Sequence, residues 1–395
     1  MHYTAPPVIG GVEQVLSEQA AQLRGAGHDV VVIAGRGDCR LLPELDSRHP
    51  AVEELARKLA AGDPGASQFE SLRRSILSSM APMLEDREVV IAHNLLTMPF
   101  NLPGAAALVD SGKPVLAWTH DHAWLNPRYQ AFQRQAEPYL QMRRLQPRTR
   151  YVAISETRQA ELADLYGVPR ATISVVPNGV DPDAFLGISA ATRALLAGTG
   201  LGAGHPLVLA PVRITRRKRL ELGLEVAAEL RIDNPGLRLL VTGPLGPHDS
   251  GNQTYWAQLR EQRRRLGLEG AVGFLHEQAG DGSHPVSDRT MAELYRLADL
   301  VLLTSESEGF GLPVAEAALA RVPIVCANIP VLREVGAGGA HLYPAGSGAT
   351  AIAETCRTAL ASEAAAFRTG VLDRYSWPSV LRRTEAVIAE CARHG

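Results

Sequence analysis

Short apolar runs alternate with longer stretches of helical period along the whole chain. In its first half the runs are rich in β-branched residues and are bounded by Gly, Pro or Asn. They cover residues 29–35, 88–94, 113–120, 150–155 and 172–178. Buried parallel strands have this pattern. Between the runs apolar positions recur on one helical face, as over 11–26, where two glycines end the predicted helix.

The same alternation restarts after residue 181. Further strands are predicted at 206–211, 237–244, 271–276, 300–305 and 323–328, and further helices at 218–232, 254–267, 288–299 and 313–321. Two successive arrays of this kind predict an α/β protein with two doubly wound parallel-sheet domains. We expect a first domain over 1–180, a second over 181–375 and a last helix within 376–395. Ligands of such sheets bind beyond the carboxyl ends of the strands.

Composition narrows the functional classes. The chain has 395 residues, 46% of them hydrophobic, and a formal net charge of −2, which predicts globular domains without a field that attracts nucleic acid. No apolar run approaches the roughly 20 residues that span a bilayer. The first seven residues lack the basic region and apolar core of a signal peptide. The four cysteines are far apart, so a reducing, cytoplasmic location is expected.

The strand at 300–305 leads into a loop suited to phosphate. Two glycines, Gly309 and Gly311, precede a helix with Pro313 in its first turn, and such a helix start directs backbone N–H groups and a positive dipole end beyond the strand. Glu308 lies on this loop and Glu316 on the helix, where a carboxylate accepts hydrogen bonds from a sugar diol. An ordinary turn with a solvated pair of glutamates fits the same pattern.

A second loop, after the strand at 206–211, is basic. Arg213 and Lys218 are spaced so that both side chains reach one cleft, where they suit a diphosphate whose negative charge grows as a bond breaks. For the neighbouring arginines we favour a solvated basic turn. Only three lysines occur among the 40 basic residues, which draws attention to Lys218.

Two loops of the first domain carry further candidates. Gly10 and Gly11 open the first helix and allow close backbone approach to a ligand. His120, Asp121 and His122 follow the strand at 113–120, at the edge where function concentrates. Their side chains point in different directions, so we expect no metal site there.

These segments together resemble glycosyltransferase family 4, a large family of retaining enzymes of the GT-B fold. The resemblance spans nearly the whole chain, from Gly10-Gly11-Val12-Glu13 through VPNGVD (176–181) to GFLHE (273–277). Its most specific part is ADLVLLTSESEGFGLPVAEAALARVPIV. The fold it implies has two facing Rossmann-like domains with an interdomain cleft. The first domain would bind the acceptor and the second the donor, and the last helix would cross back to the first domain.

The resemblance also implies roles for single residues. Arg213 and Lys218 would grip the donor diphosphate, Glu316 the ribose and Glu308 the transferred sugar, and His120 would contact the sugar and the incoming hydroxyl. Further donor contacts are implied for Gly10, Gly11, His276, Glu277, Gly309, Phe310, Gly311 and Leu312. The implied reaction moves a hexose, mannose or glucose, from GDP-mannose or UDP-glucose to a hydroxyl, with retention and without a metal or other cofactor.

Three features depart from the family pattern. Arg219 and Arg321 stand where Gly is usual, and we expect both to alter the shape of the donor pocket. Only nine residues precede Gly10, where the family has a full strand, so we expect the true start to lie upstream. The acceptor remains open: a small molecule, a glycan or a lipid-linked compound.

Other functions fit the same pattern. A GT-B nucleotide-sugar epimerase and a catalytically silent nucleotide-sugar-binding subunit are the alternatives, whereas a phosphorylase would need a pyridoxal-phosphate lysine. The arginine-rich segment 128–150 suits a phosphorylated acceptor or an anionic membrane, but a solvated helix face explains it more simply. We expect no nucleic-acid partner and a monomer or homodimer.

Overall fold

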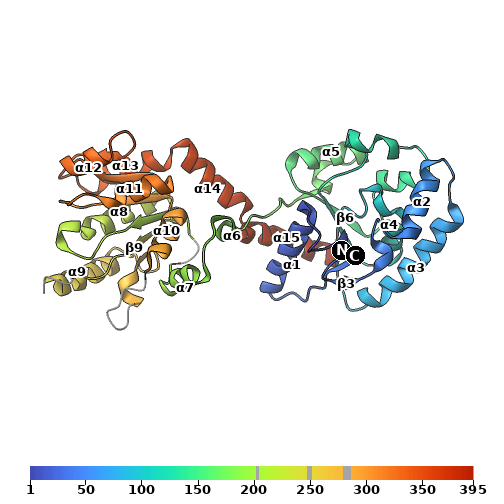
Figure 1. The fold of residues 1–395 in the computed structure, drawn as a ribbon, viewed down its shortest axis with the longest axis horizontal. Coiled ribbons are helices and arrows are strands. Elements are labelled where there is room, and N and C mark those ends of the chain that lie inside the picture. The colour runs from blue at the N-terminus through green and yellow to red at the C-terminus, as the bar shows by residue number, and fades with distance from the viewer. Residues whose placement is uncertain (202–203, 247–250, 279–285, 395) are drawn as a thin grey trace. The chain divides into compact units, whose positions relative to one another are not determined.

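The chain forms two compact units in the computed structural model (Figure 1). The first contains Met1–Val180 and Arg374–Gly395, and the second contains Asp181–Asp373. The structure describes residues 1–201, 204–246, 251–278 and 286–394. Each unit has its own parallel sheet and its own hydrophobic core, so the predicted α/β class with doubly wound parallel sheets is confirmed.

The second unit is built on six parallel strands. In chain order they are β8 (Leu207–Ala210), β9 (Arg238–Val241), β10 (Val272–Phe274), β11 (Leu300–Leu303), β12 (Ile324–Ala327) and β13 (His341–Tyr343). Their order in the sheet is β10-β9-β8-β11-β12-β13. The chain thus moves outward from β8 and then returns to its other side with β11. This reversal is the topological switch point of a doubly wound sheet, where ligands bind.

Helices precede, connect and follow these strands. They are α6 (Pro182–Leu186), α7 (Ala190–Gly198), α8 (Leu220–Asp233), α9 (Gly251–Arg265), α10 (Asp288–Leu297), α11 (Leu312–Ala320), α12 (Pro330–Val335), α13 (Ala349–Leu360) and α14 (Glu363–Tyr375). α8 packs beside α13, and α10 packs beside α11. Their apolar faces enclose the strands, whose residues are almost all buried, as expected for a sheet covered by helices.

The first unit has seven parallel strands in two hydrogen-bonded groups. One group is β1 (His2–Thr4), β2 (Ile33–Arg36) and β3 (Arg40–Leu41), and the other is β4 (Val90–His93), β5 (Val115–Thr119), β6 (Thr149–Ala153) and β7 (Ser174–Val175). The groups adjoin at the start of the chain, because the Met1 carbonyl accepts a hydrogen bond of 2.9 Å from the His93 N–H. The carboxyl ends of β1, β4 and β5 therefore lie along one edge.

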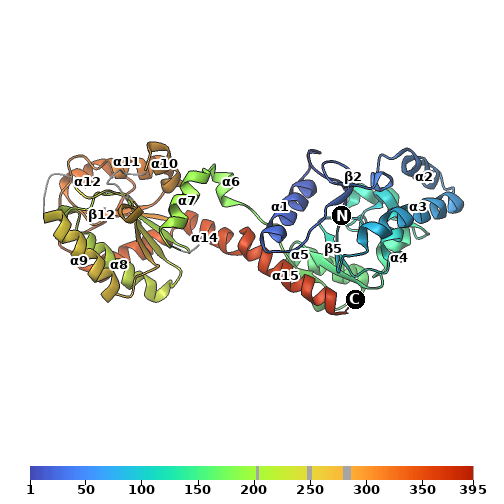
Figure 2. The ribbon, with the colours of Figure 1, turned by 90° about the horizontal axis from the view of Figure 1, so that it is seen from below.

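Helices cover both faces of this unit. They are α1 (Gly11–Gly25), α2 (Pro50–Ala60), α3 (Ala66–Leu84), α4 (Leu102–Asp110), α5 (Glu156–Tyr166) and α15 (Trp377–His394). α3 packs along α4, while α15 packs beside α1 and over β5 (Figure 2). Trp377 and Val380 of α15 share an apolar cluster with Leu116 and Trp118 of β5. The last helix thus completes the core of the unit that contains the first residues.

A close contact with Trp377 leaves no space for a side chain at Gly179, in the VPNGVD segment. A Cβ atom on this residue would lie 2.4 Å from Cδ2 of the Trp377 indole. Any side chain here would push the ring out of its site. The indole Nε1–H also donates to Glu18 of α1 at 2.9 Å, so Trp377 joins three segments that are distant in sequence.

Candidate active site

The loops that follow β8 and β11 are tied together at the switch point. Thr304 donates from its hydroxyl to the Lys218 carbonyl at 2.8 Å, and the Glu306 N–H donates to the Arg217 carbonyl at 2.8 Å. The Arg217 guanidinium in turn donates to the Ser307 carbonyl at 3.0 Å. Because β8 and β11 are neighbours, the two loops predicted to hold a diphosphate emerge side by side.

Lys218 and Glu308 face each other within these loops. The ammonium and carboxylate form an ion pair, and both side chains are largely buried, at 8% and 7% exposure. Burial lowers the pKa of Lys218, which the neighbouring Glu308 partly opposes. Two of the predicted donor-binding residues are thus brought together and neutralise each other. Arg213 is exposed and has no hydrogen bond or ion pair within the described ranges.

The start of α11 offers backbone N–H groups. Among the described residues, no acceptor takes the N–H groups of residues 309–312. Gly311, the residue before the helix, has φ of 88° in the left-handed region, and a Cβ there would lie 2.7 Å from Leu332. Glycine is therefore required at this turn. Phe310 and Leu312 flank it and are more than half exposed.

Glu316 and the segment after β10 complete the predicted donor group. Glu316 lies on the exposed side of α11 and accepts a hydrogen bond of 2.6 Å from the hydroxyl of Tyr295. Glu277 is held at both carboxylate oxygens by Arg263, at 2.7 and 2.8 Å. His276 lies edge-to-face on Trp256. The structure therefore engages Glu277 in an internal ion pair, whereas one oxygen of Glu316 keeps no partner among the described residues.

The two arginines at usual glycine positions occupy left-handed turns. Arg219 has φ of 49° before α8, and Arg321 has φ of 59° after α11. Such conformations explain why glycine is usual there. Arg321 lines a separate pocket with Asp299, His341 and Arg368, near the amino ends of β11 and β12. This position is at the opposite ends of the strands from the loops predicted to hold the donor, which contradicts the expectation that Arg321 alters the donor pocket.

His120, in the first unit, is held by His93, the last residue of β4, and by Asn94, which follows it. Its Nε2 lies 3.0 Å from Nδ1 of His93, which leaves Nδ1 as its second ring nitrogen. The Asn94 side chain accepts from the N–H groups of His120 and Asp121, at 2.9 and 3.1 Å, and Asn94 itself has a left-handed φ of 56°. Sequence reasoning missed both residues, although they end the predicted strand at 88–94 as His120 ends the one at 113–120.

The Gly10-Gly11 loop reaches the same edge through Glu13. The Glu13 carboxylate accepts from Thr4 at 2.5 Å and lies 3.7 Å from His2, whose other nitrogen contacts the His93 carbonyl at 2.8 Å. A Cβ on Gly10 would lie 2.1 Å from this carboxylate, so Gly10 makes room for Glu13. Gly11 has open space around it. The loop and His120 are thus linked through His2 and His93 within the first unit, whereas the other residues predicted to bind the donor lie in the second.

His122 points into the core, not toward this edge. Its Nε2–H donates to the Met142 carbonyl at 2.9 Å, while its Nδ1 accepts from the Trp124 N–H at 3.1 Å. The side chain is fully buried, and burial lowers its pKa from 6.5 to about 4. The expectation that consecutive residues 120–122 point in different directions is confirmed, and His122 is structural.

Acid is expected to destabilise the first unit through this histidine. The folded pKa lies below the unfolded one, so the contribution of His122 is complete above pH 6.5 and is lost as pH falls toward 4. At pH 5 the loss is about 2 kcal/mol of unfolding free energy. Denaturant unfolding at pH 7 and pH 5 measures it. His122→Leu should reduce the pH dependence of the unfolding free energy. The control, His28→Gln at an exposed position, should leave it unchanged. An equal pH dependence in the wild type and in His122→Leu would contradict the role of His122.

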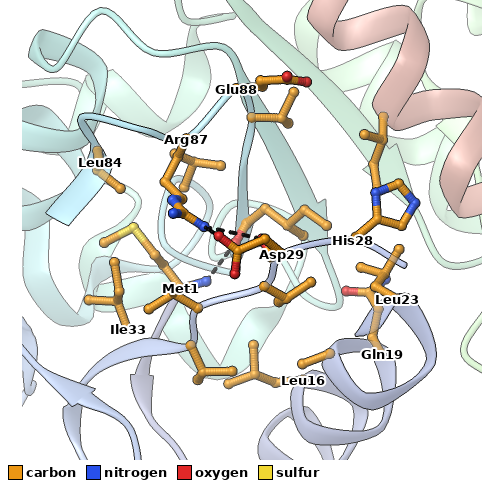
Figure 3. Close-up of a pocket in the computed structure, with 18 of the residues that line it drawn as sticks. Met1, Leu16, Gln19, Leu23, His28, Asp29, Ile33, Leu84, Arg87 and Glu88 are labelled. Carbon is orange, nitrogen blue, oxygen red and sulfur yellow. Dashed lines mark hydrogen bonds and ion pairs between the residues drawn. The ribbon is translucent and has the colours of Figure 1, made fainter. Parts of the chain in front are cut away.

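A pocket of about 370 Å³ lies elsewhere in the first unit (Figure 3). It is bounded by Met1, by residues 27–33 before and within β2, and by residues 84–91 before and within β4. The Met1 amino group donates to the Ile91 carbonyl at 2.6 Å, and Arg87 is paired with Asp29. Its walls are mostly apolar, and Arg87 and Asp29 are paired with each other, whereas Glu88 points away from them (Figure 3). None of the predicted site residues lines this pocket.

Several arginines of the 128–150 segment have structural partners. Arg134 donates to the carbonyls of Leu59 and Ala60 at the end of α2, and Arg150 pairs with Glu390 of α15 at 2.8 Å. Within the described ranges, no helix is long and apolar enough to cross a membrane. Nor does that part of the chain gather three or more His, Cys, Asp or Glu side chains where they would hold a metal ion.

Comparison with known proteins assigns the family. The model of Glycosyltransferase Family 4 matches residues 9–184, and that of Glycosyl transferases group 1 matches residues 195–369. A D-inositol 3-phosphate glycosyltransferase of Nocardia farcinica is 37% identical over 46% of this chain and 38% of its own length. Another from Kineococcus radiotolerans is 30% identical over 82% of this chain and 74% of its own length.

Two further matches are shorter or less similar to this chain. A mannosylfructose-phosphate synthase of Agrobacterium fabrum is 30% identical over 44% of this chain and 36% of its own length. The crystal structure of Anabaena Alr3699/HepE with UDP and glucose covers 98% of this chain and 100% of that one, at 18% identity and a TM-score of 0.37, too low to carry a conclusion. The two family models and the long match to the Kineococcus protein are sufficient, and the chain belongs to glycosyltransferase family 4.

Proposed function

We propose that the protein transfers a hexose from a nucleoside-diphosphate sugar to a hydroxyl group, with retention of configuration and without a metal ion. The observation that carries the proposal is the paired loops at the switch point. They place the buried Lys218–Glu308 pair beside the N–H groups of residues 309–312, for which the described part of the chain offers no acceptor. A cation and a set of aligned amides are what a departing diphosphate requires.

The proposed mechanism begins with exchange of partners. The donor diphosphate replaces Glu308 as the partner of Lys218, and Arg213, which is exposed, adds a second cation. Glu308 is then free to accept a hydrogen bond from the transferred sugar. As the carbon–oxygen bond to the sugar breaks, charge accumulates on the diphosphate, where Lys218, Arg213 and the amides stabilise it. The acceptor hydroxyl attacks the same face, and its proton passes to the leaving phosphate.

The first unit would supply the acceptor side. His120 is neutral near pH 7, because burial lowers its pKa to about 4. A neutral imidazole with one nitrogen held by His93 has Nδ1 to offer to a hydroxyl group. The names of two relatives contain a phosphorylated polyhydroxy compound, inositol 3-phosphate in one and mannosylfructose-phosphate in the other. Phosphorylated polyols are therefore the first acceptors to test.

Nucleoside diphosphates are expected to stabilise the protein, and the matching base should do so most. A ligand at 100 times its Kd adds about 2.7 kcal/mol of apparent stability. UDP, GDP and ADP, each with and without its hexose, are compared by thermal unfolding in the presence and absence of EDTA. A rise in midpoint with one nucleotide, unchanged by EDTA, supports the proposal. No rise with any nucleotide, or a rise that EDTA removes, contradicts it.

Product analysis separates transfer from the alternatives. Incubation of the bound sugar nucleotide with phosphorylated polyols should give a glycoside and the free nucleoside diphosphate, with the anomeric configuration of the donor. Conversion of the sugar nucleotide without an acceptor would indicate an epimerase. Binding with neither reaction would indicate a silent subunit.

A further inference from the structure

Tyr295 lies beneath the carboxylate of Glu316. It belongs to α10, which packs beside α11, the helix that carries Glu316. Its side chain is 3% exposed, and its hydroxyl donates to Oε2 of Glu316 at 2.6 Å. A buried ring thus presents its one polar atom to an exposed carboxylate.

The contact restricts a side chain that would otherwise move freely. A glutamate on an exposed helix face samples several rotamers, and ordering it on ligand binding costs conformational entropy. The tyrosine hydroxyl fixes one oxygen and leaves Oε1 and the remaining lone pairs for a ligand. Burial, with the neighbouring Glu316, raises the pKa of Tyr295 far above neutrality, so the hydroxyl stays a donor at all working pH values.

We propose that Tyr295 is a positioning residue for nucleotide recognition: it holds Glu316 in the orientation that accepts two hydrogen bonds from the vicinal diol of a ribose. This inference rests on the proposed function, in which Glu316 meets the donor ribose. The opposite interpretation is that the bond only fastens α10 to α11. The two interpretations predict different affinities. Only a positioning role makes the effect of a Tyr295 substitution on nucleotide affinity depend on the ribose hydroxyls.

The test is Tyr295→Phe, which keeps the ring and removes only the hydroxyl. Its affinity is measured by calorimetry for the nucleoside diphosphate that stabilises the wild type most, for the 2′,3′-dideoxy form of that nucleotide, and for inorganic pyrophosphate. We expect about a tenfold loss for the ribonucleotide, in line with one charge-assisted hydrogen bond held less well. We expect less than about a twofold change for the other two ligands.

Tyr343→Phe is the matched control. Tyr343 is equally buried, at 3%, and donates its hydroxyl to the Leu303 carbonyl at 3.0 Å in the same unit. It loses a buried hydrogen bond without touching Glu316, so its three affinities should match the wild type. A second variant, Glu316→Ala, removes the carboxylate that Tyr295 contacts. Adding Tyr295→Phe to this variant should therefore change none of the three affinities further.

Two results would overturn the inference. One is a ribonucleotide affinity of Tyr295→Phe equal to that of the wild type. The other is an equal loss for the dideoxy nucleotide or pyrophosphate, which would make the contact merely structural. Failure of the proposed function looks different, because it shows in the wild type itself, which would then bind none of the nucleotides or bind them without transferring the sugar.

Discussion

Replacing Lys218 by alanine is expected to lower kcat/KM for glycosyl transfer by about 100- to 1,000-fold, the effect of removing one preorganised donor from a developing anion. The ammonium is held where the loops after β8 and β11 meet, beside Glu308. The charge on the diphosphate is largest in the transition state, so the loss should appear mainly in kcat, with donor saturating.

Two variants separate this role from folding. Removing one member of a buried ion pair leaves the other unpaired, so thermal midpoints must be recorded alongside the kinetics. Lys218→Met keeps the unbranched stem and should lose activity as alanine does. Arg217→Ala is the control, since its guanidinium is 54% exposed and lies 3.7 Å from Glu308; about a threefold change or less is expected there. A folded Lys218 variant with wild-type kcat/KM would contradict the proposed diphosphate site.

Replacing Trp377 by alanine is expected to lower the unfolding free energy of the first unit by about 3–5 kcal/mol, the usual cost of emptying a large aromatic site. The indole is 3% exposed and packs with Leu116, Trp118 and Val176. Urea unfolding followed by circular dichroism measures the change. Phe367→Ala, at an exposed position, is the control, and it should lower the unfolding free energy by no more than about 0.5 kcal/mol. A larger loss in this control would indicate a nonspecific effect.

Two milder variants dissect that cost. Trp377→Phe keeps most of the packing and removes the 2.9 Å hydrogen bond to Glu18, for which about 1 kcal/mol is expected. Gly179→Ala should destabilise by forcing the indole aside, because the added Cβ falls 2.4 Å from the ring. If Trp377→Ala unfolded at the wild-type denaturant concentration, the last helix would not belong to the core of this unit.

Periodicity found most strands, but the predicted helices did not include α3, the longest described helix, or α13. All ten predicted strands contain a strand in the structure, because continuous apolar runs mark a sheet covered on both faces. It missed β1, β3 and β13, which have two or three residues each. β7 and β10 are as short and were predicted, because they lie within longer apolar runs. β2 also begins at Ile33 and not at residue 29, since its neighbour β1 pairs only opposite Ala34 and Arg36.

Site residues were predictable by type and position but not by partner. Glycines, a helix start and two basic residues identified both loops of the switch point, and parallel-sheet topology explains why they meet. No pattern indicated that Lys218 pairs with Glu308, since 90 residues separate them. No pattern set Tyr295 apart from the other residues of the predicted helix at 288–299. The role proposed for it depends on a hydroxyl that only the packing of α10 on α11 directs to Glu316.

The return of α15 has a consequence for how the chain is made. The second unit is one continuous segment, whereas the first is assembled from Met1–Val180 and Arg374–Gly395. During translation from the amino terminus, domains fold as units when their residues have emerged. The first unit is therefore begun first and completed last. Until Trp377 leaves the ribosome, α15 cannot cover the apolar face of β5, whereas the strands of the second unit have already been synthesised. The order of completion reverses the order of synthesis.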